Sequence, residues 1–155
     1  MHRLLPLVLL CGLVSPLLAA DPKPVKADRA TLEKEFAEKL SGATLVGTFT
    51  TDGKEGSKPD RYKIVSAEKV NDNAWVITAT MKVGGNDVDI PMSIPVYWAD
   101  DTPILSLTDL TIPGVGTFTS RVMFYGNRYA GTWQHGDHGG TFAGVIEKAK
   151  PKDKK

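Results

Sequence analysis

From residue 45 to residue 147 the chain is a succession of short segments in which apolar and polar residues alternate, separated by turn residues. The clearest example has apolar residues at every second position from Val88 to Trp98. A period of two is typical of a strand with one buried face. We therefore expect eight strands, at 45–51, 62–70, 75–83, 88–98, 104–112, 118–125, 129–135 and 142–147.

Short turns without intervening helices favour an antiparallel meander, since parallel strands need long crossovers. Eight such strands remove their two free edges by closing into a barrel, which we expect over 44–147. A two-sheet sandwich is the alternative. Pro91 and Pro95 are an even number of residues apart, so both missing N–H groups point toward the same neighbouring strand. If the barrel is incomplete anywhere, we expect the gap beside the strand at 88–98.

One amphipathic helix is expected before the strands, over 29–41. Leu32, Phe36 and Leu40 recur every four residues between charged positions, which gives a single apolar stripe. Asp28 or Thr31 is suited to begin this helix, and Gly42 to end it. The fold class is therefore all-β, an eight-stranded meander barrel preceded by one helix.

The first 20 residues have the layout of a secretory signal peptide, with Arg3, an apolar run from Leu4 to Leu18 and then two alanines. We expect export to the periplasm or the extracellular space, with no integral membrane segment after cleavage. Residues 21–28 are expected to be a linker, 29–147 a single domain, and 148–155 a disordered lysine-rich tail.

Composition excludes several functions. The chain has 19 Lys and Arg against 18 Asp and Glu, and no basic patch interleaved with aromatics lies outside the tail, so nucleic acid is not an expected partner. Its one cysteine, Cys11, lies in the leader, and no Gly-x-Ser-x-Gly motif is present. We expect no enzymatic activity and no cofactor.

Two groups of residues are candidates for a site. Trp133 and His135 alternate with polar neighbours, so they share a strand face; if that face is interior, Trp133 forms a wall and His135 a polar group near the rim, with Trp98 as a further aromatic. In the alternative, Trp133 only fills a packed core, with Gly131 and Gly144 making room for it.

His135, Asp137 and His138 are of metal-ligating types. A glycine-rich turn does not aim such side chains at one point, so we expect the histidines in solvent and no metal. A metal-dependent enzyme at this turn remains the alternative.

The runs Leu40–Phe49 and Gly131–Gly136 resemble those of small exported bacterial proteins of unknown function. Gly47-Thr48-Phe49, on the first strand after a helix, is similar to the Gly-x-Trp start of the calycins, the lipocalin and avidin-type barrels, with Phe49 in place of Trp. The calycin resemblance implies an Arg, at 121 or 128, over that aromatic.

The preferred function is a non-enzymatic barrel that binds a small, partly apolar molecule. The alternative is a structural or interaction module of the cell envelope with a filled core.

Overall fold

The computed structural model describes residues 27–148. The predicted signal peptide, most of the predicted linker and residues 149–155 of the predicted tail lie outside them. No helix in the described range is both long and apolar enough to cross a membrane.

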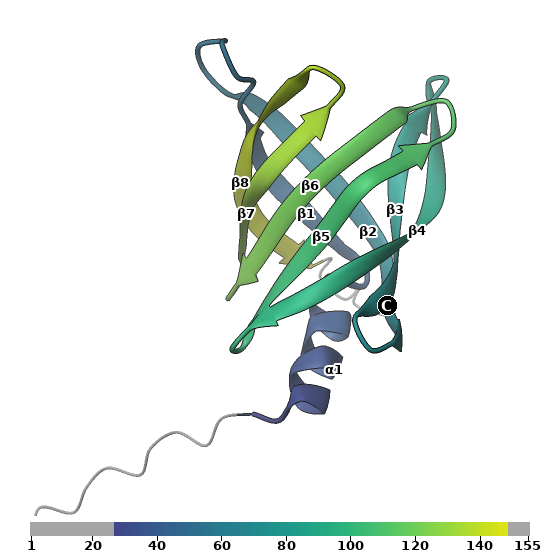
Figure 1. The fold of residues 1–155 in the computed structure, drawn as a ribbon, viewed down its shortest axis with the longest axis vertical. Helices are drawn as coiled ribbons and strands as arrows, with labels where there is room; N and C mark the ends of the chain where they lie inside the picture. Colours follow the sequence, from purple (N-terminus) through teal and green to yellow (C-terminus); the bar gives the residue numbers. More distant parts are fainter. Residues whose placement is uncertain (1–26, 149–155) are drawn as a thin grey trace, which may run out of the picture.

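Eight antiparallel strands form a closed barrel in which each strand pairs with the next and β8 pairs with β1 (Figure 1). The prediction of a meander barrel after one helix is confirmed, and the sandwich alternative is wrong. One helix, α1 (Arg29–Leu40), precedes the barrel. The strands are β1 (Ala43–Phe49), β2 (Lys58–Asn71), β3 (Ala74–Val83), β4 (Asn86–Ala99), β5 (Thr102–Ile112), β6 (Gly116–Tyr125), β7 (Arg128–His135) and β8 (His138–Lys148).

Local chemistry defines both ends of α1. Asp28 is the N-cap, and its carboxylate accepts a hydrogen bond from the Thr31 N–H at 2.9 Å. That bond holds the pKa of Asp28 below its ordinary value, because it favours the charged carboxylate. At the other end Gly42 has φ +71°, a left-handed conformation that glycine adopts without strain.

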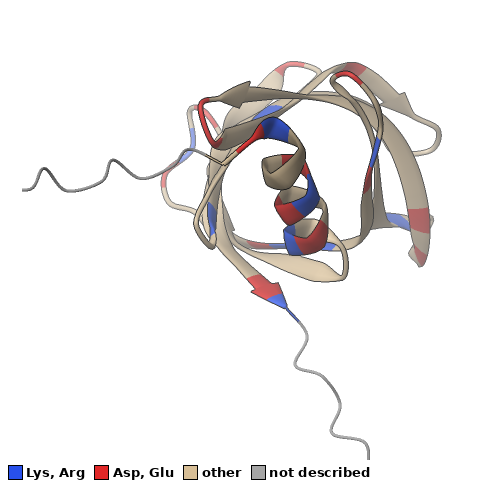
Figure 2. Cartoon of the chain, turned by 90° about the horizontal axis from the view of Figure 1, so that it is seen from below, with Lys and Arg blue, Asp and Glu red and all other residues tan. Residues whose placement is uncertain are grey.

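Helix α1 closes one end of the barrel, and Figure 2, seen from below, shows it across the opening within the ring of strands. Its charged residues are exposed apart from Glu33, which is half-buried. Phe36 and Leu40 are buried at the end of the core. The Phe36 ring lies edge-on to Trp75 at 5.2 Å and to Trp98 at 5.9 Å between ring centroids. Burial of this apolar stripe is what holds the helix in the opening.

The shortest of the eight ladders joins β4 to β5, with four residue pairs from Val96–Leu105 to Ala99–Thr102. The N–H of Val96 donates to the Asn73 carbonyl on the β3 side at 2.8 Å. Because successive N–H groups point to opposite neighbours, the nitrogens of Pro91 and Pro95 face β5. The ladder ends next to Pro95, which has no N–H to donate. The barrel is therefore closed, and its shortest ladder lies beside β4, where the sequence predicted the weak point.

Two predicted details are wrong. Strand β2 begins at Lys58, four residues before the expected start at residue 62. Strand β8 begins at His138, before the expected start at residue 142, so the turn between β7 and β8 consists of Gly136 and Asp137. Both strands are longer because pairing with their neighbours extends them: Lys58 pairs with Phe49, and Gly140 with Trp133.

Candidate functional site

The barrel encloses a cavity of about 580 Å³ between α1 and the opposite end. Its wall is mostly apolar, and Leu40 of α1 forms part of its floor. The alternation along each strand places these side chains, since residues of one parity point inward. The apolar lining residues include Leu45, Ile64, Ile77, Ala79, Met92, Ile94, Leu105, Leu107, Ile112, Val122, Phe124 and Phe142.

Trp133 is half-buried and lines this cavity, as one prediction placed it. Its indole N–H donates to the Thr50 carbonyl at 3.0 Å, and its ring packs edge-on against Phe49 with centroids 6.0 Å apart. A Cβ on Gly140 would lie 2.1 Å from the Thr50 carbonyl oxygen and 3.0 Å from the indole nitrogen, so this glycine allows the close approach of the Thr50 backbone. The glycines expected to make room for the ring, Gly131 and Gly144, instead have backbone atoms of Arg121 and Val46 nearest to where a Cβ would lie.

His135 is exposed at the end of β7, and its ring stacks on Phe118 with centroids 4.4 Å apart and an interplanar angle of 24°. Phe118 lines the cavity, whereas His135 does not. Trp98 lies at the helix end, between Phe36 and the guanidinium of Arg29, which is 4.6 Å from the Trp98 ring centroid. Of the three predicted ligand-contacting residues, only Trp133 reaches the cavity.

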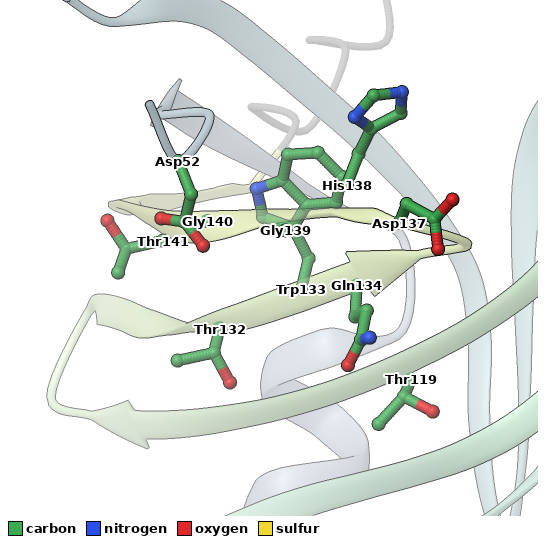
Figure 3. Close-up of a pocket in the computed structure, with 10 residues that line it drawn as sticks. All are labelled: Asp52, Thr119, Thr132, Trp133, Gln134, Asp137, His138, Gly139, Gly140 and Thr141. Atoms are coloured by element: carbon green, nitrogen blue, oxygen red, sulfur yellow. The ribbon is translucent and has the colours of Figure 1, made fainter. Parts of the chain in front are cut away.

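A second, polar hollow of about 420 Å³ lies around the β7–β8 hairpin. Figure 3 shows Asp137 and His138 projecting in different directions from this hairpin. His135 does not line the hollow, so the turn does not gather the three predicted metal-ligating side chains. No group of three or more His, Cys, Asp or Glu side chains that could hold a metal ion occurs among residues 27–148.

The calycin resemblance implied an arginine over Phe49, but Trp133 packs there instead. Arg121 points outward and donates to the Leu107 carbonyl and, at 2.8 Å, to the Thr108 hydroxyl. These bonds brace the irregular pairing of β5 with β6 between Leu107 and Leu110. Arg128 is exposed at the β6–β7 turn.

The residues that the sequence analysis missed are Asp60, Tyr62 and Tyr129, which form a polar cluster on the inner face. Tyr62 lines the cavity, and its ring lies 6.5 Å from that of Phe142. Burial and the neighbouring Asp60 carboxylate raise the pKa of Tyr62 well above its ordinary value. Burial, and then the Asp60 charge, also raise the pKa of Tyr129.

Two oxygens of this cluster, Asp60 Oδ2 and the Tyr129 hydroxyl, are buried with no hydrogen-bond partner within the described chain. Buried polar atoms are normally paired, so this cluster is one polar feature of a mostly apolar interior. The period-two pattern at 60, 62 and 64 is the sequence signal for this cluster, but Asp60 lies before the predicted start of the strand at Tyr62.

Comparison with known proteins identifies no relative: no protein-family model, curated protein or solved structure matches this chain. The barrel is compatible with a calycin-like fold, and its geometry is the basis for any functional assignment.

Proposed function

We propose that this chain is an exported, non-enzymatic barrel that binds one small, mostly apolar molecule in its cavity. The observation that carries the proposal is the cavity itself, because about 580 Å³ lies within the range of roughly 300–1,000 Å³ typical of small-molecule sites. A filled core, which the interaction-module alternative requires, would leave no such volume.

Binding rather than catalysis is supported by the lining. Its inward-facing side chains are apolar apart from a few polar groups such as Tyr62 and Ser120, a composition suited to orienting a ligand. His135 and His138 do not line it, so no imidazole faces the bound molecule as a general base. Export, and membership of an exported family of calycin-type barrels, rest on the sequence patterns alone.

The first test is a titration with N-phenyl-1-naphthylamine, a neutral apolar probe that fluoresces when it leaves water. We expect saturable binding with one probe per barrel. Ala79→Phe places a large side chain in the cavity from a buried wall position and should abolish binding. The matched control is Ala130→Phe, an exposed position on β7.

Ala79→Leu is the milder variant if the phenylalanine prevents folding, and it should weaken binding. Probe binding that Ala79→Phe leaves unchanged in a folded protein, or no saturable binding at all, would refute the proposal. Native mass spectrometry of the exported protein from its own host gives a second readout: a discrete extra mass, lost on denaturation, would be the carried ligand.

A further inference from the structure

At the end opposite α1 the barrel wall lacks ladder pairs in two places, between β4 and β5 beyond Val96–Leu105 and between β2 and β3 beyond Lys63–Thr80. The second of these gaps is the one beside which charged residues line the cavity. The β2–β3 ladder begins at the pair Lys63–Thr80 and continues toward the helix end. Beyond this pair, Lys58–Tyr62 pair only with β1, and Met81–Val83 pair only with β4. Figure 1 shows the β3–β4 hairpin diverging from β2 in this direction. The two strands therefore leave a split in the wall.

The cavity reaches the outer surface through this split. Besides the inward-facing residues, its lining includes Arg61 and Lys63 of β2, Thr80 and Lys82 of β3, and Asp87 of β4. In a continuous wall, residues of this parity face only the outside. They line the cavity here because the wall between them is open, so a ligand in the cavity has its outer end beside these five residues.

The charges around the split are arranged unequally. On the hairpin side, Lys82 is paired with Asp87 at 2.8 Å, and Asp89 accepts a hydrogen bond from Thr80 at 2.6 Å. On the β2 side, Arg61 and Lys63 are exposed, and neither side chain forms an ion pair with a carboxylate within residues 27–148. These two cations are free to bind an anionic group at the opening.

Among the described residues, the cations that line the cavity are Arg61, Lys63 and Lys82, and all three lie at the split. Lys82 is already paired with Asp87, so Arg61 and Lys63 are the cations that an anionic group of a ligand would meet there. Toward α1 the lining is apolar, with Leu40, Ile77 and Ile94 among its residues, and an ionised group in such surroundings costs free energy. This pattern orients a ligand, with its apolar part inside and an anionic end outside.

We propose that the ligand is a single-chain anionic amphiphile, whose chain fills the cavity and whose carboxylate or phosphate head lies in the split between β2 and β3 against Arg61 and Lys63. This inference rests on the proposed binding function and adds to it the chemical class and the orientation of the ligand.

Displacement of N-phenyl-1-naphthylamine by four compounds with the same ten-carbon chain tests the inference. The competitors are decanoate, decyl phosphate, decan-1-ol and decyltrimethylammonium, the charged compounds below their micelle-forming concentrations and the alcohol below its solubility limit. We expect the better of the two anions to displace the probe at a concentration about five- to tenfold lower than the ammonium compound does, as two partly exposed charge contacts allow. Whichever anion is better identifies the head group, and either one supports the class.

The double variant Arg61→Gln/Lys63→Gln should lose this preference for anions, with each displacement measured relative to the variant's own affinity for the probe. Lys34→Gln/Lys39→Gln, which removes two exposed cations from α1 at the other end, should keep it. The preference should also shrink as NaCl rises, because salt screens exposed charges.

Equal or tighter binding of decyltrimethylammonium would overturn the inference. An anion preference that survives the Arg61/Lys63 substitution would overturn it as well. In both cases saturable probe binding would leave the proposed function standing, whereas the loss of probe binding in the unmodified protein would remove the function itself.

Discussion

Replacement of Phe36 by alanine tests whether α1 is part of the cooperative core. Phe36 is 3% exposed, and its ring contacts Trp75, Trp98 and Phe124 with centroids 5.2, 5.9 and 5.4 Å away. Truncation of a buried phenylalanine typically costs about 3–5 kcal/mol, which combines lost apolar burial with the cavity left behind. Three aromatic contacts place this residue in the middle of that range or above it.

We therefore expect Phe36→Ala to lower the free energy of unfolding by about 4 kcal/mol, a large fraction of the roughly 5–15 kcal/mol of a whole domain. With a urea m-value of about 2 kcal/mol/M, the midpoint of unfolding falls by about 2 M. Tryptophan fluorescence is the assay, because Trp75 and Trp98 both touch the deleted ring. Far-ultraviolet circular dichroism should give the same transition.

The control is Lys34→Ala on the same helix, whose side chain is 77% exposed. It should change stability by no more than about 0.5 kcal/mol. A loss below about 1 kcal/mol for Phe36→Ala, or a helix transition separate from that of the barrel, would contradict the argument. Either result would mean that α1 rests on the opening without closing it.

Two further predictions concern the barrel wall. Gly144→Ala should destabilise the fold by at least about 2 kcal/mol in the same urea assay, because its Cβ would lie 2.1 Å from the Val46 carbonyl oxygen, a backbone atom that cannot move aside. The control is Ala143→Ser at the exposed neighbouring position. Equal losses of stability for the two variants would refute the clash. Since the pKa of Tyr62 is raised in the folded state, the unfolded chain releases its phenolic proton first as the pH rises. The contribution of the Tyr62 hydroxyl to the free energy of unfolding is thus complete below about pH 10 and is lost as the pH rises above it. Tyr62→Phe should therefore make the free energy of unfolding fall less steeply above pH 10. An unchanged slope would show that Tyr62 does not cause the fall.

The architecture was predictable because it depends on local patterns that repeat. Alternation over 88–98 specified an inward face for β4, and short turns specified a meander. The seam was predictable too, because Pro91 and Pro95 remove donors whatever the surroundings. Each of these features depends on residues close together in the chain, so one sequence contains the necessary information.

The ends of strands were less predictable, because pairing with a neighbour decides them. Lys58 and Pro59 resemble loop residues by composition, but β1 pairs with them and extends β2 by four residues beyond the predicted start at Tyr62. This extension brings Asp60 into the barrel wall. The Asp60 carboxylate was therefore overlooked, because it lies before the predicted start of the strand.

The candidate site was the least predictable part, since it arises from a mismatch between ladders. Nothing in the residues of β2 or β3 alone indicates that their pairing stops at Lys63–Thr80. Beyond this pair, β2 continues to pair with β1, and β3 continues to pair with β4. The end of the β2–β3 ladder therefore depends on the other strands of the closed barrel. Outward-facing Arg61 and Lys63 look like ordinary solvated charges in the sequence, and they become candidates for ligand contact only because the adjacent wall is open. The turn with His135 and His138 illustrates the same point: the residue types are visible in the sequence, but whether these side chains reach the cavity is not, and neither of them lines it.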